Sequence, residues 1–250
     1  MTKPNKAISH ALSTMAVILV IVIWQLYAIR IDNSSFMPGP IKVFTALFEL
    51  LGDGETYKII FTTLLRLIIS IIIASTVGLF LGLVSGIRYQ VEALLRPVVS
   101  SLRTLPVISI VIVILILYGN AVSLYIISFL LLFPLIYQSE LDGIKNIDST
   151  LLEVLKLDCD KCSLPAVKMV FLPLSLPHFR TGILQSAGLG IKVLVVAEFI
   201  AQAEISIGKE LAFAKAGFEY SYVFAWTIIL IVIVVGMEHF IQRYLRYTTK

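Results

Sequence analysis

TLPVISIVIVILILYGNAVSLYIISFLLLFPLIYQS is the stretch from Thr104 to Ser139, and it contains no Asp, Glu, Lys or Arg. A helix needs about 20 apolar residues to cross the hydrocarbon core of a bilayer, so this stretch is long enough for two crossings. Gly119-Asn120 is the only place in it for a tight turn. The sequence therefore predicts two membrane spans here, at residues 97–118 and 121–137.

The composition of the whole chain extends this interpretation. Of the 250 residues, 58% are hydrophobic and 14% are charged, and the mean hydropathy is +0.96. Soluble domains carry roughly 45–50% apolar and about 25% charged residues, which excludes an ordinary cytosolic enzyme. A disordered chain would be polar, and a disulfide-stapled secreted domain would need more than the two cysteines present. A polytopic membrane protein remains.

Four further apolar stretches bring the predicted number of spans to six: residues 11–29, 59–87, 181–201 and 220–237. Runs of about 20 apolar residues without strict alternation favour helices over the strands of a barrel. The first run is longer than the core of a typical cleaved signal, and no small-residue cleavage site follows it. We predict an all-α membrane protein with about six transmembrane helices, in one domain over residues 1–250 with a core at about 55–245.

The distribution of Lys and Arg predicts the orientation of these spans. With the N-terminus in the cytoplasm, the inner side holds 12 basic residues and the outer side 5. The inner ones are Lys3, Lys6, Arg88, Arg96, Lys145, Lys156, Lys161, Lys168, Arg180, Arg243, Arg246 and Lys250, and the outer ones are Arg30, Lys42, Lys58, Lys209 and Lys215. Cytoplasmic loops carry the excess of basic residues, so we expect both termini inside. This also explains the net charge of +4 without a nucleic-acid partner.

Two segments outside the spans are expected to be structured. Residues 40–51 have apolar side chains at helical spacing after a Pro-Gly-Pro stop, which predicts an amphipathic surface helix. The other segment is the cytoplasmic loop at 138–180. In it we expect Thr150 to cap a short helix and Glu153 to return a bond to the cap. A second short helix follows Ser163 and closes at Leu172-Pro173, and Pro177 breaks the chain again before the fifth span.

This loop resembles the Glu-Ala-Ala…Gly…Ile-x-Leu-Pro loop of ABC importer permeases. Glu153-Val154-Leu155 and Val170-Phe171-Leu172-Pro173 carry the resemblance. Further stretches resemble the nitrate, sulfonate and taurine branch of that family: Met37-Pro38-Gly39-Pro40, Thr63-Leu64-Leu65-Arg66, Leu102-Arg103-Thr104-Leu105-Pro106, Val196-Ala197-Glu198 and Ser206-Ile207-Gly208. The resemblance covers roughly residues 36–245. Val154 and Leu155 stand where two alanines are usual, and the family's glycine falls on Cys159 or Asp160.

The resemblance implies a type I ABC importer permease fold with a cytoplasmic coupling helix, in a bacterial inner membrane. It implies a homodimer, driven by a cytoplasmic ABC ATPase dimer and fed by an extracytoplasmic substrate-binding protein. The solute would be small and polar or anionic, such as a sulfonate, nitrate, taurine or a vitamin precursor. The residues expected to couple to the ATPase are Thr150, Glu153, Val154, Leu155, Leu172 and Pro173. The chain has no phosphate-binding loop, so ATP and Mg²⁺ are expected on the partner and no catalytic residue here.

Three charges within spans are candidates for a translocation path or gate: Arg66, Lys192 and Glu198. Charges in the membrane are costly and normally face a cavity or a partner. Lys192 and Glu198 are six residues apart and so about 120° apart around a helix, which prevents them from pairing with each other. The alternative for Lys192 and for Glu198 is a structural ion pair with another residue. The alternative for Arg66 is a side chain that reaches the outer headgroups.

Other functions are less well supported by the residues. A self-contained secondary transporter or channel is the alternative, but such proteins are often built from paired repeats, and none is evident. Cys159 and Cys162 have the spacing of a metal or redox pair, yet zinc needs four ligands and one chain supplies too few, so we expect no metal. The three histidines, His10, His178 and His239, lie outside the middle of the spans, which argues against a membrane-embedded enzyme.

Overall fold

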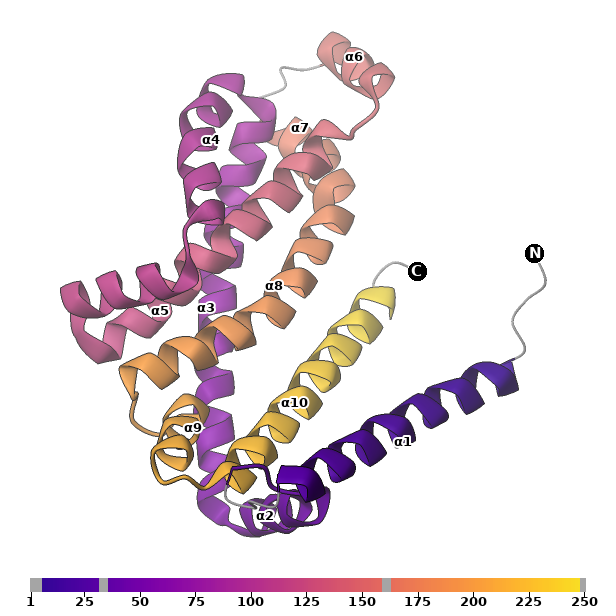
Figure 1. Cartoon of the computed structure of the whole chain (residues 1–250). Helices are drawn as coiled ribbons and strands as arrows, with labels where there is room; N and C mark the ends of the chain where they lie inside the picture. The colour runs from indigo at the N-terminus through magenta and orange to yellow at the C-terminus, as the bar shows by residue number, and fades with distance from the viewer. Residues whose placement is uncertain (1–5, 32–35, 159–162, 248–250) are drawn as a thin grey trace. The chain divides into compact units, whose positions relative to one another are not determined.

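The computed structural model describes residues 6–31, 36–158 and 163–247, and these residues form helices and connecting turns without a strand. The helices are α1 (Lys6–Ile31), α2 (Pro40–Gly52), α3 (Gly54–Ile87), α4 (Tyr89–Thr104), α5 (Val107–Lys145), α6 (Ser149–Asp158), α7 (Leu164–Ala166), the π-helix η1 (Val167–Phe171), α8 (Leu172–Ala201), α9 (Ile207–Ala216) and α10 (Tyr220–Tyr247) (Figure 1). The predicted all-α class is confirmed.

Five of these helical stretches are long and apolar enough to cross a membrane: Thr14–Ile31, Gly54–Ile87, Val122–Lys145, Leu164–Ala201 and Tyr220–Arg243. A sixth is obtained by counting α4 and Val107–Asn120 as one bent span. The predicted third span, at residues 97–118, is therefore wrong as a single straight helix, because the two pieces meet at 103°.

The bend has a local cause at Leu105-Pro106. Leu105 has ψ 134° and Pro106 has ψ 127°, so both lie in the extended region. A proline has no N–H to donate, and its ring disfavours the helical conformation for the residue before it. Pro106 therefore ends α4 and starts a new helix.

The predicted turn at Gly119-Asn120 is confirmed. Gly119 has φ 69° and ψ −176°, a backbone conformation that glycine adopts without steric cost. Figure 1 shows α5 folding back on itself here. Ser123 Oγ donates hydrogen bonds to the carbonyls of Gly119 and Ile114, and Asn120 Nδ2 donates to the Ala201 carbonyl at 3.0 Å.

The predicted stop at Leu172-Pro173 and the predicted break at Pro177 are wrong. Both prolines lie inside α8, which is continuous from Leu172 to Ala201. Pro173 lies in the first turn of α8, where a missing N–H costs little. Pro177 removes one backbone bond from a helix that packs along α5, and this packing holds the helix together. The segment between α5 and α8 is thus shorter than the predicted loop at 138–180.

The chain divides into two compact units, which are described separately. The first holds residues 1–57 and 210–231. Its α2 confirms the predicted helix at residues 40–51, in which Val43 is buried, whereas Ile41 and Phe48 are 79% and 71% exposed. Its position on the outer membrane surface stays a prediction. Trp24 of α1 donates a hydrogen bond to the Pro38 carbonyl at 3.1 Å and stacks on Phe224.

The second unit holds residues 58–209 and 232–250. In it α3 presents a small residue to α5 at every fourth position: Ala74, Gly78, Gly82 and Gly86. A Cβ on Gly82 would lie 2.8 Å from the Cβ of Glu140, and one on Gly86 would lie 2.8 Å from that of Ile144. Small residues at this spacing let two membrane helices approach closely.

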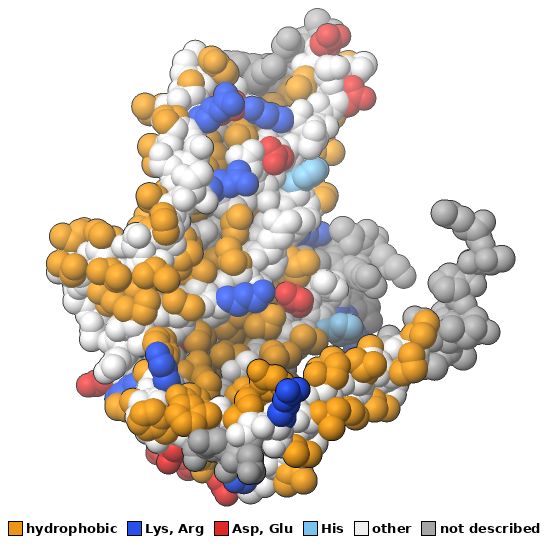
Figure 2. Space-filling view, viewed as in Figure 1, with side chains coloured by type: hydrophobic (Ala, Val, Ile, Leu, Met, Phe, Trp, Pro, Cys, Tyr) orange, Lys and Arg blue, Asp and Glu red, His pale blue; other side chains and the backbone are white. Residues whose placement is uncertain are grey.

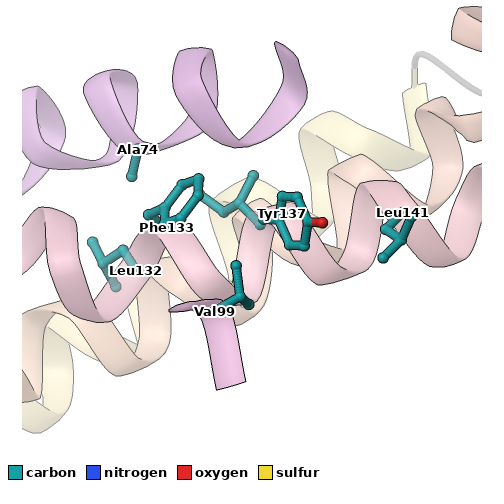
Figure 3. Close-up of a cluster of buried hydrophobic side chains, with 7 residues drawn as sticks. Ala74, Val99, Leu132, Phe133, Tyr137 and Leu141 are labelled. Carbon is teal, nitrogen blue, oxygen red and sulfur yellow. The ribbon is translucent and has the colours of Figure 1, made fainter. Parts of the chain in front are cut away.

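A cluster of buried side chains lies where α3, α4 and α5 meet. Figure 3 shows Phe133 and Tyr137 of α5 between Ala74 of α3 and Val99 of α4. Tyr137 is 1% exposed and Ala74 is not exposed at all. The cluster holds α4 against α5 and leaves a polar cleft beside it.

Candidate functional site

Glu198 lies at the end of α8 with no exposed surface. Its Oε1 is 3.0 Å from Nη1 of Arg66 on α3. Thr63 Oγ1, one turn earlier on α3, is 3.1 Å from both carboxylate oxygens, and the Gly208 N–H donates to Oε2 at 3.4 Å. A buried carboxylate needs a cation and hydrogen-bond donors, and the chain itself supplies all of them here.

The same groups also fix the turn that follows. Arg66 donates to the carbonyls of Glu204 at 2.9 Å and Ile205 at 3.2 Å, and Thr63 Oγ1 accepts from the Ile207 N–H. Ile205 has φ 48°, a strained value for a β-branched residue. We call residues 198–208 the α8–α9 corner. Its backbone conformation is held by side chains of α3.

Lys192 is placed differently from Glu198. It is exposed, and among the described residues no acidic side chain lies within ion-pair distance. His178, Thr181 and Gln185 are exposed on the same face of α8, because the spacings of 3, 4 and 7 residues keep side chains within about 60° of one another. These four residues form a polar stripe from His178 to Lys192. α8, which is long enough to cross the membrane, therefore has one polar face.

Two cavities continue this polar face toward α4 and α5. The smaller, about 290 Å³, contains His178, Thr181 and Gln185 of α8 together with Arg103 and Asp142. The larger, about 590 Å³, is lined by Glu92, Arg96, Val99, Ser100, Arg103, Thr104, Tyr137, Gln138, Leu141 and Lys145. Arg103 and Gln138 border both cavities. Figure 2 shows Lys and Arg side chains gathered over α4 and along α8.

This cleft was not identified from the sequence. A signal was present, because Glu92, Arg96 and Arg103 recur at spacings of 4 and 7 and so share one helical face. The cleft could not be predicted without the bend at Pro106, which sets the direction of α4 relative to α5.

The predicted coupling residues lie in the segment between α5 and α8. We call the described part of it, residues 146–158 and 163–171, the knob. The predicted cap at Thr150 is wrong, because α6 begins at Ser149 and Asp148 caps it: the Thr150 N–H donates to Asp148 Oδ1 at 2.8 Å. This bond from the Thr150 backbone lowers the pKa of Asp148 below its ordinary value. Glu153 is exposed in the first turns of α6.

Apolar side chains stand exposed on the knob. Val154 of α6 is 59% exposed, and Leu164 and Met169 are 79% and 77% exposed. An apolar cavity of about 370 Å³ lies between Val154 and Met169, and it is lined by Leu151, Val154, Leu155, Pro165, Ala166, Met169 and Val170. Clustered exposed apolar groups mark a surface where another molecule binds.

The opposite side of the knob is anchored to the ends of the spans. Phe171, which is 2% exposed, and Ala166 pack with Ile147 and with Ile144 at the end of α5. Leu83 and Ile87 at the end of α3 and Leu152 and Leu155 of α6 pack against the same cluster. A force on the knob would therefore reach α3 and α5 directly.

The remaining predicted residues are placed as follows. Leu172 and Pro173 form the first turn of α8, next to the knob. Cys159 and Cys162, and the family glycine position at 159 or 160, lie outside the described residues. Within the described part of the chain, no group of three or more His, Cys, Asp and Glu side chains is arranged to hold a metal ion.

Several long apolar helices, a polar face through one unit and an anchored apolar knob define a multi-pass membrane transport protein. The chain belongs to the family of binding-protein-dependent transport system inner membrane components, whose sequence profile matches residues 74–246.

Named relatives agree with this assignment. The chain is 26% identical over 217 residues to a Bacillus subtilis protein named as the aliphatic sulfonates transport permease SsuC, covering 86% of this chain and 78% of that protein. It is 24% identical to the taurine transport system permease TauC of Escherichia coli, over 79% of this chain and 73% of TauC. It is 26% identical to a protein of Methanocaldococcus jannaschii named as an ABC transporter permease, over 99% of this chain and 95% of that protein. The predicted recognition is confirmed, and the alternative of a self-contained transporter is set aside.

Proposed function

We propose that this chain is the membrane permease of an importer that moves a small polar or anionic solute inward by alternating access, driven by ATP hydrolysis in a separate chain. Relatives named for aliphatic sulfonates and taurine support this class of solute. The partners would be a second copy of the chain, a cytoplasmic ABC ATPase dimer that binds ATP and Mg²⁺, and an extracytoplasmic substrate-binding protein.

The observation that carries the proposal is the knob. Its outer side presents Val154, Leu164 and Met169 to another molecule, and its inner side is packed on the ends of α3 and α5. In this arrangement the ATPase docks on the apolar cavity around Val154, and its closure moves Phe171 and Ala166 together with the two spans. Thr150, Glu153, Leu155, Leu172 and Pro173 frame this contact.

The three charges in the spans take two roles in the proposed cycle. Lys192, on the exposed polar stripe of α8, lines the translocation path, because a lipid-facing cation would cost a few kcal/mol on insertion scales. Arg66 and Glu198 hold the α8–α9 corner rigid, so that it serves as one side of an outer gate. The orientation follows from the 12 to 5 distribution of basic residues, with both termini in the cytoplasm of a bacterial cell and the membrane being the inner one.

The test is reconstitution of the full chain in liposomes with an ATPase and a binding protein encoded beside it. We expect no hydrolysis of ATP by the chain alone, and solute-stimulated hydrolysis when all components are present. Val154→Asp should abolish co-purification of the ATPase, whereas Tyr89→Asp, a change at an exposed residue at the start of α4 outside the knob, should retain it. Hydrolysis by the chain alone, or an unchanged ATPase complex with Val154→Asp, would overturn the proposal.

The orientation is tested separately. A reporter fused after Lys161 should be active in the cytoplasm, and one inserted near Gly54 should be active outside. Both reporters on one side of the membrane would contradict the proposed topology.

A further inference from the structure

The cleft between α4 and α5 holds more positive than negative charge. Arg96, Arg103 and Lys145 line its 590 Å³, and Glu92 is the only carboxylate among the residues that line it. Lys145 Nζ pairs with Glu92 Oε1. Two cations are therefore in surplus, in a cavity whose volume falls in the range of about 300–1,000 Å³ typical of small-molecule sites.

The two arginines are free to bind a ligand. Among the described residues, neither Arg96 nor Arg103 has an ion-pair or hydrogen-bond partner, although Asp142 borders the adjoining cavity beside Arg103. They are seven residues apart on α4 and so project from one face about 10 Å apart along the axis. Guanidinium groups match the geometry of an oxyanion and bind it through paired N–H donors.

The cleft also offers neutral groups suited to an anion. The side chains of Ser100, Thr104 and Gln138 line it and carry hydrogen-bond donors. The only apolar aliphatic side chains that line it are those of Val99 and Leu141. This composition suits a small hydrated anion and not an extended apolar ligand.

The placement of the apolar side chains on α4 indicates that the ligand of the cleft is a dissolved anion and not the phosphate of a lipid. Leu94 and Val98 of α4 are 72% and 53% exposed, and they lie about 160–200° around the helix from Arg96. Acyl chains lie along such apolar surface, which here faces away from the cleft. A lipid headgroup in the cleft would have its chains on the wrong side of α4.

We propose that Arg96 and Arg103 form a binding site for one small oxyanion of the sulfonate or phosphate type, in the cleft between α4 and α5. The site rests on the proposed function in one respect: its occupant is the transported solute, held near the cytoplasmic end of the path before release. Lys145, whose charge is balanced by Glu92, makes no direct bond to the anion.

Methanesulfonate is the probe, titrated calorimetrically at low ionic strength into the full chain in phosphatidylcholine nanodiscs. We expect saturable binding of one anion per chain. Arg96→Gln and Arg103→Gln should each weaken Kd about tenfold or more, the loss expected for one charge-assisted contact. Arg88→Gln, the same change beside the start of α4 and outside the cleft, should leave Kd within about threefold. Thermal unfolding of each variant verifies that it is folded.

Three results would overturn the site. They are no saturable binding by the wild type, an equal loss with Arg88→Gln, and loss of methanesulfonate binding when phosphatidylglycerol is added to the nanodiscs, which would mean that a lipid headgroup occupies the cleft. The titration needs no ATPase. A chain that supports coupled transport but binds no anion therefore disproves the cleft alone, and one that binds the anion but never engages an ATPase disproves the proposed function alone.

Discussion

The two ends of α8 differ in which side chains are buried and which are exposed. At its C-terminal end the α8–α9 corner buries a full charge, Glu198, and surrounds it with partners from the same chain. At its N-terminal end the knob leaves Val154, Leu164 and Met169 in contact with the surroundings. The charge at the corner has its partners within one chain, whereas these apolar side chains of the knob are left exposed. The first arrangement suits a rigid structural element and the second a docking surface.

The largest effect is expected from breaking the ion pair at the corner. Glu198→Leu leaves Arg66, whose side chain is 16% exposed, without its counter-charge, and removes the acceptor for Thr63 and the Gly208 N–H. We expect a loss of about 3–5 kcal/mol in the free energy of unfolding, as for other half-removed buried pairs. Denaturant titration of the purified chain in detergent measures it.

A double variant and a matched control make this prediction specific. Arg66→Met combined with Glu198→Leu should be less destabilised than Glu198→Leu alone, since no charge is left unpaired. Glu204→Gln changes an exposed carboxylate in the same corner and should stay within about 0.5 kcal/mol. Additive losses in the double variant would contradict a coupled pair.

The second effect concerns the close packing of the corner. A Cβ on Gly208 would lie 2.4 Å from the Phe199 nitrogen and 2.6 Å from the Val195 carbonyl oxygen, and these backbone atoms cannot rotate away. Gly208→Ala should therefore cost about 1–3 kcal/mol, the usual range for overpacking. Gly236→Ala, where nothing lies within 4 Å, should be neutral or stabilising. Equal stabilities in the same titration would show that the corner is loose.

The comparison also shows which features the sequence could predict. Span positions depend on local apolar runs, and the turn at Gly119 depends on a single small residue, so both were found. The bend at Pro106 and the continuity of α8 through Pro177 were missed, because a proline signals a break in both cases and only packing decides the outcome. α8 lies along α5 and continues through Pro177, whereas α4 ends at Thr104, shortly before Pro106.

The partners of the charged side chains in the spans were equally hard to predict from the sequence. Helix geometry correctly excluded a pair between Lys192 and Glu198, yet the partner that Glu198 has, Arg66, lies 132 residues away in the chain. No local pattern reports a contact of that separation. Glu198 and Arg66 were both singled out as charges in spans, but joining them required the α3–α8 packing. The roles of Lys192 and the coupling residues stay predictions.

A smaller effect is expected at the start of α6 in the knob. The pKa of Asp148 is lowered by the hydrogen bond from the Thr150 N–H, so its carboxylate stabilises α6 at neutral pH. That stabilisation is lost as the pH falls through the pKa of Asp148 in the folded protein. Asp148→Ala should speed hydrogen exchange of the first α6 amides at pH 7 and remove the pH dependence. Thr150→Ala, which keeps its own N–H, should change the exchange less.

The smallest effect on the stability of the isolated chain is expected at the exposed apolar side chains of the knob. This result would distinguish the knob most clearly from the α8–α9 corner. Met169→Ser alters a side chain that is 77% exposed, so little apolar contact within the chain is lost. The free energy of unfolding should change by less than about 0.5 kcal/mol. Phe171→Ala, two residues away at a position 2% exposed, should cost about 3–5 kcal/mol in the same titration. Affinity for the ATPase should fall with Met169→Ser even though stability does not, because that side chain is buried only when the partner binds. If Met169→Ser destabilised the chain as much as Phe171→Ala, Met169 would be part of the chain's own core. The knob would then be packed within one chain, as the α8–α9 corner is.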